Sequence, residues 1–322
     1  MVMRSFTSNS DKRCAALLAG LAWGAITAVA YTLWINPEIS FWKFAYEKKL
    51  AWSKRVSTDF PSKTVFAGGS SCAFQIDASF LTREAGIPAV NMGMHAGMGS
   101  QALLAIALTA VNPVDTVVVA IEPGLLKDAP EVMPFGWQML FATGAIWDPR
   151  AQIALGHASV WTAVPHLRPG LAHCVAMTGK GLSGKAPYRY SRDDVHDGGE
   201  ITTGVRMPCR PFPPTPMRLN PLAATWLDSI AKESPPLASD WAVLLAAGLT
   251  NPADCRASIQ LLTNFQSGFS SRFLRLGAPE LAIIDNPNAF ADTPLHMTPE
   301  AMRARTIAIA ARLRSQLIDF QK

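Results

Sequence analysis

The run DTVVVAI, residues 115–121, decides the fold. Its valines and isoleucine follow one another without alternating polar residues, as in strands that protein covers on both faces. Two shorter apolar runs, TVFA at 64–67 and AVNM at 89–92, also end in glycine, and helix-like segments separate the three. This alternation predicts right-handed crossovers and a parallel sheet in a three-layer α/β/α fold.

The pattern predicts further elements on both sides of a long interruption. A helix is expected over 101–111, and after the interruption a strand over 241–245, a helix over 256–265 and a last strand, ELAII, over 280–284. Thr298, Pro299 and Glu300 have the order of a helix start, with the helix continuing to about residue 318. We expect one α/β domain over 62–322.

The interruption covers 124–235 and is rich in proline, glycine and aromatic residues. We interpret it as a large insertion or lid over the sheet edge rather than as a separate domain.

The segment 14–35 predicts a membrane anchor. It has no charged residue, and as a helix it would span roughly 33 Å, enough for a bilayer core. Arg4, Lys12 and Arg13 precede it, which indicates a cytoplasmic N-terminus, although several lysines also follow. Residues 1–37 would therefore be a cytoplasmic tail and single-pass anchor in a bacterial inner membrane, with the remaining domain in the periplasm.

Two other interpretations of this segment stay open. Ala28-Val29-Ala30 has the small-x-small form of a signal-peptide cleavage site, although the apolar run continues beyond it. A buried helix of a soluble protein is the third alternative. Residues 38–61 follow the anchor with aromatic residues among lysines, and we expect an amphipathic juxtamembrane helix there.

Composition excludes some classes of protein. The 322 residues carry a net charge of +5, but the basic residues are dispersed, so we expect no nucleic-acid partner. The five cysteines do not make a disulfide scaffold; one pair among Cys174, Cys209 and Cys255 could be oxidised in a periplasmic domain. No spacing of Cys or His indicates a metal site, and no cofactor is expected.

Two distant segments could supply acyl-transfer chemistry. GGSS at 68–71 follows the first strand, and DTPLH at 292–296 follows the last one. Ligands of parallel sheets bind at the carboxyl ends of strands. A serine hydroxyl there needs a base, and that base needs a group to orient it. Ser71, His296 and Asp292 could fill these three roles.

With these blocks the chain resembles the SGNH, or GDSL-like, hydrolase family over roughly 62–122 and 280–315. The resemblance implies that Ser71 is the nucleophile and that Asp292 and His296 complete the triad. It also implies an oxyanion-hole glycine, for which Gly97 is the first choice and Gly93 and Gly99 are the alternatives. In layout the chain is most similar to the membrane-anchored relatives of bacterial exopolysaccharide O-acetylation systems.

The chain departs from the family pattern in two places. Three residues separate Asp292 from His296, where the family has two. The family's Gly-x-Asn-Asp block after the central strand is replaced by Ile121-Glu122-Pro123-Gly124, so the asparagine donor to the oxyanion is missing. Asn91, His95 and Glu122 are the nearest substitutes.

Each of these residues also has a structural interpretation. Ser71 could cap the following helix, His296 could be a surface histidine, and Asp292 could form a turn. Glu122 could make a structural salt bridge, and His95 could be a packing histidine. The glycine groups lack the Gly-x-Gly-x-x-Gly spacing of a dinucleotide site.

The sequence therefore predicts a membrane-anchored serine esterase or O-acetyltransferase that acts on acyl esters of an exported polysaccharide. The resemblance implies an acyl donor or acylated polysaccharide as substrate and a membrane acyltransferase as a possible partner. The alternative is a non-catalytic SGNH-like protein that binds glycan or scaffolds a polysaccharide assembly.

Overall fold

Five parallel strands form the central sheet of the structure, a computed structural model that describes residues 9–31, 33, 36–167, 176, 179–180, 182–183, 188–215, 217–233 and 240–320. The strand order is β2-β1-β3-β4-β6, one of the common orders of doubly wound sheets. The strands are β1 (Thr64–Gly68), β2 (Ala89–Asn91), β3 (Thr116–Ala120), β4 (Asp240–Val243) and β6 (Phe273–Arg275). The predicted α/β class and parallel sheet are confirmed.

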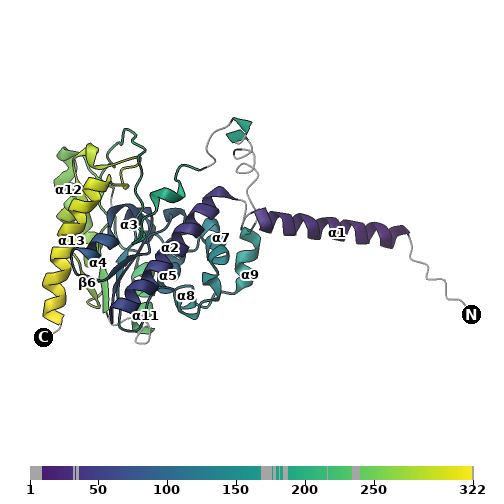
Figure 1. Cartoon of the computed structure of the whole chain (residues 1–322), viewed down its shortest axis with the longest axis horizontal. Helices are drawn as coiled ribbons and strands as arrows, with labels where there is room; N and C mark the ends of the chain where they lie inside the picture. Colours follow the sequence, from purple (N-terminus) through teal and green to yellow (C-terminus); the bar gives the residue numbers. More distant parts are fainter. Residues whose placement is uncertain are drawn as a thin grey trace, which may run out of the picture.

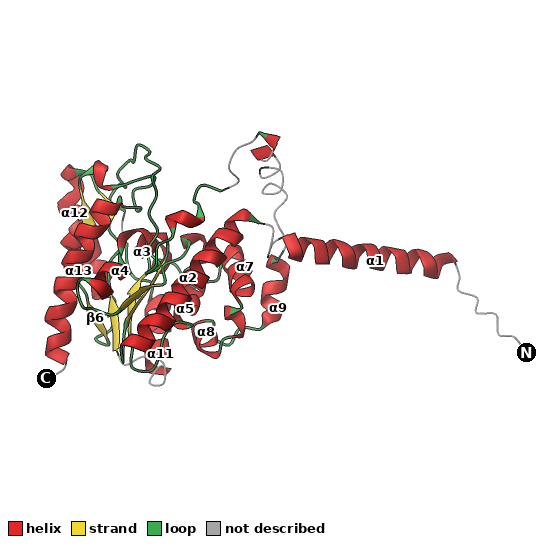
Figure 2. Ribbon diagram, viewed as in Figure 1, coloured by secondary structure: helices red, strands yellow, loops and turns green. Residues whose placement is uncertain are grey.

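Helices cover both faces of this sheet (Figure 2). The described helices are α1 (Asn9–Ala30), which lies outside these layers, and α2 (Pro37–Asp59), α3 (Ser70–Gln75), α4 (Ala78–Arg83), α5 (Ser100–Leu108), α6 (Pro123–Leu126), α7 (Pro134–Thr143), α8 (Pro149–Ala154), α9 (Val160–Ala163), α11 (Pro221–Glu233), α12 (Cys255–Ser267) and α13 (Pro299–Phe320).

Successive residues of the central strands enter two different cores. Val117 and Val119 pack with α2, α5, α7 and α8, whereas Val118 packs with α3, α4 and α13. All three valines are fully buried. An unbroken run of apolar residues is required where both faces of a strand are covered, which is why DTVVVAI forms the centre of the sheet.

The order of the strands places two loops next to each other. β1 pairs with β2 on one side and with β3 on the other, and Gly68 is aligned with Ala120. The chain therefore leaves the sheet in opposite directions from β1 and β3. Doubly wound sheets bind ligands where the strand order reverses in this way, at the carboxyl ends of the two strands. Ser71 and Glu122 follow these two strand ends.

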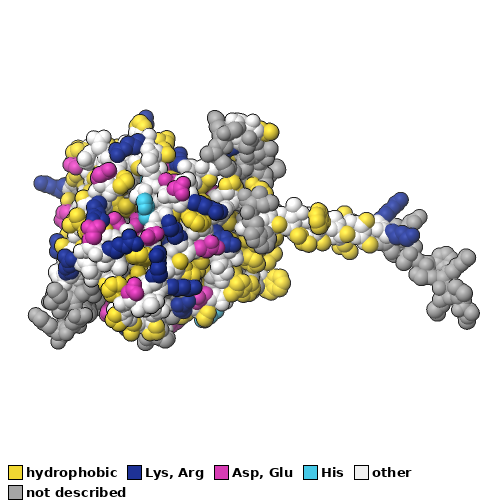
Figure 3. Space-filling model, in the orientation of Figure 1, with side chains coloured by type: hydrophobic (Ala, Val, Ile, Leu, Met, Phe, Trp, Pro, Cys, Tyr) yellow, Lys and Arg dark blue, Asp and Glu magenta, His cyan; other side chains and the backbone are white. Residues whose placement is uncertain are grey.

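One described helix is long and apolar enough to cross a membrane. The candidate span, Lys12–Ala30, lies in α1 and has no buried residue. α1 extends away from the α/β body, on the opposite side from α12 and α13 (Figure 1), and its surface is mostly hydrophobic (Figure 3). Arg4 and Ile35, which the sequence prediction also used, lie outside the described residues.

The helix expected over 38–61 forms, as α2, but its surroundings differ from the prediction. Four of its aromatic residues, Phe41, Trp42, Tyr46 and Trp52, are buried inside the domain, where α2 packs against β2 and α7. Trp52 Nε1 donates to the carbonyl of Ala89 at 2.9 Å, and Lys49 is fully buried with its ammonium donating to the carbonyls of Asn91 and Gly199. Burial lowers the pKa of Lys49 to about 8. One face of this helix is therefore an integral part of the α/β body, which the sequence analysis did not anticipate.

The predicted strand over 280–284 is wrong in extent and in partner. Pro279–Ala282 form a 3-10 turn, and only β7 (Ile283–Ile284) is extended; it pairs with β5 (Gly248–Leu249) in a separate two-stranded sheet. The fifth strand of the main sheet is instead β6, which the sequence analysis missed. With three residues, β6 is too short to give a periodic signal.

The segment 124–235 contributes helices to the α/β body and a long loop that contacts α3 and the loop carrying Asp292. α7 and α8 pack on α5, so they thicken one helical layer. Further along, Ile201 donates its N–H to the carbonyl of Ala73, and Met207 donates to the carbonyl of Ala291. The stretch after Tyr188 therefore passes over α3 and then along the loop that carries Asp292. His173 and Cys174 lie outside the described residues.

Candidate functional site

Ser71 lies in the first turn of α3, directly beyond the carboxyl end of β1. Its backbone N–H and its hydroxyl both donate to Glu122 Oε1, at 2.9 and 2.7 Å. The side chain is completely buried. The hydroxyl predicted as a nucleophile is therefore held by the carboxylate of Glu122, which follows the neighbouring strand β3.

The glycines before Ser71 allow this contact. A Cβ on Gly69 would collide with both carboxylate oxygens of Glu122, and a Cβ on Gly68 would collide with the Ala120 carbonyl. Neither glycine has a positive φ in the described backbone. The two positions thus need glycine because the Ala120 carbonyl and the Glu122 carboxylate come so close to them. An unusual backbone conformation is not the reason.

Glu122 is a buried carboxylate with one oxygen in use. Only 6% of the residue is exposed, and Oε2 has no hydrogen-bond partner among the described residues. An unpaired buried carboxylate oxygen is costly, and the described residues supply no donor to it. Glu122 is also one of the residues that line a cavity of about 480 Å³.

His296 and Asp292 form the expected pair. His296 Nδ1 lies 2.9 Å from Asp292 Oδ1 across a tight loop, which the Ala291 N–H closes by donating to the His296 carbonyl. The extra residue between them, relative to the family pattern, does not prevent this contact. Both residues are buried.

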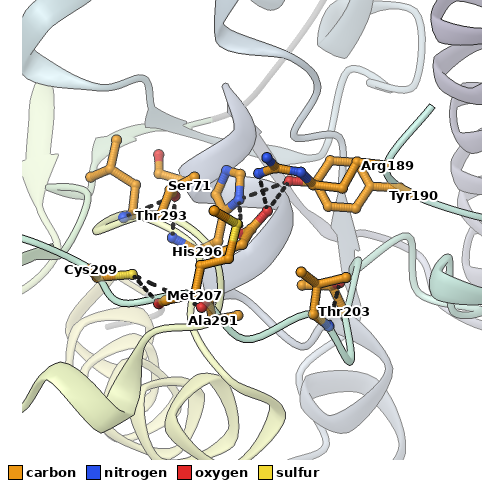
Figure 4. A network of polar contacts seen from close by, with 12 residues as sticks. Ser71, Arg189, Tyr190, Thr203, Met207, Cys209, Ala291, Thr293 and His296 are labelled. Atoms are coloured by element: carbon orange, nitrogen blue, oxygen red, sulfur yellow. Dashed lines mark hydrogen bonds and ion pairs between the residues drawn. The ribbon is translucent and has the colours of Figure 1, made fainter. Parts of the chain in front are cut away.

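Two residues of the insertion complete the surroundings of Asp292. Arg189 Nη1 donates to Asp292 Oδ2 at 2.9 Å, and the Tyr190 hydroxyl donates to the same oxygen at 2.8 Å (Figure 4). Burial by itself raises the pKa of Asp292, but the hydrogen bonds from His296, Tyr190 and Arg189 outweigh it and lower the pKa to about 2. Asp292 is therefore an anion that can orient an imidazole and stabilise its protonated form.

The short helix α3 links Ser71 to the histidine loop. The ring of Phe74 stacks on the ring of His296, with centroids 4.0 Å apart and planes inclined by 12°. Gln75 Nε2 donates to the Leu295 carbonyl at 2.7 Å and to the Ala247 carbonyl at 2.6 Å. One turn of helix thus separates Ser71 from the residues that hold His296.

The described hydrogen bonds do not join Ser71 to His296. The serine hydroxyl is turned toward Glu122, while His296 directs Nδ1 toward Asp292 and Tyr190. In the described part of the chain, His296 Nε2 has no hydrogen-bond partner. Of the three residues predicted as a triad, the structure thus joins Asp292 to His296, while Ser71 is held by Glu122.

The residues proposed for the oxyanion site have other partners. The Gly97 N–H donates to His95 Nδ1 at 3.0 Å, and the Gly93 N–H donates to Asn91 Oδ1 at 2.9 Å. Gly99 has a φ of 82° and donates to the Ala96 carbonyl. In this conformation none of these three groups is free to stabilise an oxyanion, so the sequence-based assignment to Gly97 or its alternatives is not supported.

Asn91 and His95 have structural roles in this arrangement. Asn91 is fully buried, and its Nδ2 donates to the carbonyls of Cys72 and Ile76, which fastens α3 to β2. Burial, with a smaller electrostatic contribution from His296, lowers the pKa of His95 to about 4. His95 is therefore neutral near pH 7 and acts as the acceptor for Gly97.

Four residues of this site escaped the sequence analysis: Tyr190, Arg189, Phe74 and Gln75. Tyr190 and Arg189 belong to a segment without secondary structure, about a hundred residues before Asp292, and no motif marks them. Phe74 and Gln75 follow the serine block as ordinary helix residues. Only the folded chain brings these four side chains to the histidine loop.

Over the described residues, no group of three or more His, Cys, Asp or Glu side chains could hold a metal ion. Cys14, Cys72, Cys209 and Cys255 are free thiols, and Cys174 lies outside the described residues.

Comparison with known proteins gives no relative for this chain: no family model, no curated protein and no solved structure matches it.

Proposed function

We propose that the protein is a serine-dependent ester hydrolase or acyltransferase of the SGNH type. The observation that carries the proposal is a contact between the buried Asp292–His296 pair and the helix that presents Ser71. Phe74 of that helix stacks on the His296 ring. The position of Ser71 at the switch point of a parallel sheet adds support.

In the proposed reaction Ser71 Oγ leaves Glu122 and turns toward His296. Oγ attacks the acyl carbon and its proton passes to His296 Nε2, while Asp292 stabilises the imidazolium that forms. The tetrahedral intermediate collapses to an acyl-serine, and the leaving alcohol takes the proton from His296. Attack by water then releases the acid, whereas attack by a sugar hydroxyl transfers the acyl group to the sugar.

The remaining parts of the hypothesis rest on the anchor and on the family resemblance. An exposed apolar helix before the domain supports a single-pass membrane protein, for which we propose a periplasmic domain in a bacterial inner membrane. We propose an exported polysaccharide as the carrier or acceptor of the acyl group, and a membrane acyltransferase as a possible partner.

Hydrolysis of p-nitrophenyl acetate by the full chain in lipid nanodiscs tests the nucleophile. We expect the Ser71→Ala protein to lose at least a thousandfold in kcat/KM. Ser70→Ala is the matched control, because Ser70 precedes the nucleophile in the same turn and makes no hydrogen bond to Glu122. Equal rates in wild type and Ser71→Ala would exclude Ser71 as the nucleophile.

One observation favours a second function, a non-catalytic domain that binds glycan or scaffolds a polysaccharide assembly. The Ser71 hydroxyl is fully buried and bonded to Glu122, so the same contacts would also suit a structural helix cap. A domain of this kind would hydrolyse no ester, and Ser71→Ala would change its thermal stability alone.

A further inference from the structure

We propose that the cavity beside Glu122 binds the hydrocarbon chain of a medium-chain acyl ester, so that the acyl group delivered to Ser71 is longer than acetyl. This inference rests on the proposed function and specifies its substrate class.

The walls of the cavity suit a hydrocarbon chain. Its volume of about 480 Å³ lies within the range of small-molecule sites, roughly 300–1,000 Å³. Most of the lining is apolar and comes from segments that are distant in sequence, including Phe212, Pro214, Met217, Leu262 and Ile283. The methyl of an acetyl group would leave most of this space to water in contact with apolar walls, whereas a longer chain would displace that water.

The lining of the cavity includes a neighbour of each member of the proposed catalytic pair. Glu122, whose Oε1 accepts the Ser71 hydroxyl, is one of the lining residues. Leu295, the residue before His296, is another, and its carbonyl is held by Gln75 of the serine-bearing helix. Ser71 and His296 do not themselves line the cavity, so an acyl chain bound there would end beside Glu122, the residue that holds Ser71.

Glu122 adds an acceptor group to these apolar walls. Its Oε1 accepts the Ser71 hydroxyl, and its Oε2 has no partner among the described residues. Oε2 is itself shielded from solvent, so Ser71 or Glu122 must move during the reaction before an attacking water or alcohol can donate to it.

A sugar is a poorer occupant of this cavity. Burying several hydroxyls against apolar walls without partners would be costly. Besides Glu122 and Lys127, the polar lining side chains are only Thr215, Thr250 and Ser258, too few to pair every hydroxyl of a buried ring. The sugar of a glycan ester would therefore bind outside this cavity.

Gly248 offers a way to fill the cavity without strain. A Cβ built there lies 3.7 Å from Leu295 Cδ2 and 3.8 Å from Phe212 Cδ2, ordinary contact distances to two wall residues. A leucine at this position would therefore point into the space between them. Gly204→Leu is the matched control, since a Cβ there meets nothing within 4 Å and Gly204 is not part of the lining.

The first experiment compares p-nitrophenyl acetate, butyrate, hexanoate and octanoate as substrates of the full chain in nanodiscs. In wild type we expect kcat/KM to rise by up to about fourfold for each added methylene. In Gly248→Leu the octanoate-to-acetate ratio should fall at least tenfold, while Gly204→Leu should keep the wild-type ratio. An unchanged melting temperature in Gly248→Leu shows that the variant has folded.

The second experiment measures binding without turnover. The Ser71→Ala protein is irradiated with N-methyl octanamide that carries a diazirine in its chain, and the labelled residues are mapped by mass spectrometry. We expect labels on cavity residues such as Met217 and Leu262, and a loss of these labels when Gly248→Leu is added.

The outcomes separate the two hypotheses. Labelling that Gly248→Leu abolishes, in a protein that hydrolyses no ester, supports the acyl-chain site and contradicts the proposed enzyme. Ester hydrolysis that shows no preference for longer chains, with labels scattered outside the cavity, contradicts the acyl-chain site and leaves the proposed enzyme standing.

Discussion

Two buried carboxylates stand at the carboxyl edge of the sheet, and the protein satisfies them very differently. Asp292 receives hydrogen bonds on both oxygens, from His296, Tyr190 and Arg189. Glu122 receives two donors from Ser71 on one oxygen and none from the described residues on the other. Both are almost completely shielded from solvent.

The difference separates a carboxylate that is fully paired from one that keeps an unused acceptor. A carboxylate whose oxygens are all occupied is fixed in position and charge, as Asp292 must be to orient a histidine. A carboxylate with an unused oxygen can accept one more donor once a movement of its neighbours exposes that oxygen. We therefore assign to Asp292 a role exerted through His296, and to Glu122 a role in holding Ser71 and the incoming hydroxyl.

The largest effect that this comparison predicts is that of Asp292→Asn. The amide would present a donor to His296 Nδ1 and favour the wrong tautomer, so kcat/KM for p-nitrophenyl acetate should fall by about 10⁴. Steady-state kinetics at pH 7.5 measures it. A loss below tenfold would mean that Asp292 does not orient a catalytic base.

Removing one donor to Asp292 should mainly affect stability. Tyr190→Phe deletes the 2.8 Å hydrogen bond to Oδ2 and leaves the ring against Phe74, so the free energy of unfolding should fall by about 2 kcal/mol. Urea unfolding measures this change. Tyr188→Phe, which loses a neutral bond to Trp42, is the control and should cost about 1 kcal/mol.

Glu122→Gln should lower activity much less than Asp292→Asn. The amide oxygen can still accept from Ser71, but the charge that assists the attacking hydroxyl is gone, so we expect a decrease of about tenfold in kcat/KM. A decrease as large as that of Asp292→Asn would reverse the comparison and identify Glu122, not His296, as the base for Ser71.

The smallest effect concerns acid stability. The folded-state pKa of Asp292 is about 2, below the value of about 3.9 expected in the unfolded chain. Its contribution to stability is therefore complete above about pH 4 and is lost as the pH falls toward 2. In urea unfolding, the stability difference between wild type and Asp292→Asn should shrink between pH 5 and pH 3, and a constant difference over that interval would contradict the low pKa.

Part of this site could be predicted from the sequence because Ser71 and Glu122 follow strong strands and because Asp292 and His296 lie in one loop. The run at 115–121 specified a central strand, and the position of Glu122 directly after it followed from that. The Asp292–His296 contact was predicted from two residues in one loop. Local sequence carries this kind of information well, since it concerns neighbours along the chain.

The remaining contacts depend on tertiary packing. Nothing local indicates that Tyr190 would meet Asp292 from the insertion, or that the Gly97 N–H would be taken by His95. The burial of α2 was missed because its aromatic residues and lysines fit a membrane surface equally well; only the fold shows Lys49 reaching the carbonyls of Asn91 and Gly199. Likewise, β6 is defined by its pairing with β4 rather than by its three residues.

The central claim, that Ser71 is a nucleophile activated by His296, is tested most directly by reaction with a fluorophosphonate probe. The full chain in nanodiscs is incubated with the probe, and the modified residue is found by peptide mass spectrometry. We predict one covalent adduct, on Ser71, that forms at least a hundredfold more slowly in His296→Ala and at the wild-type rate in Ser70→Ala. No adduct on Ser71, or an adduct that forms equally fast without His296, would contradict the account.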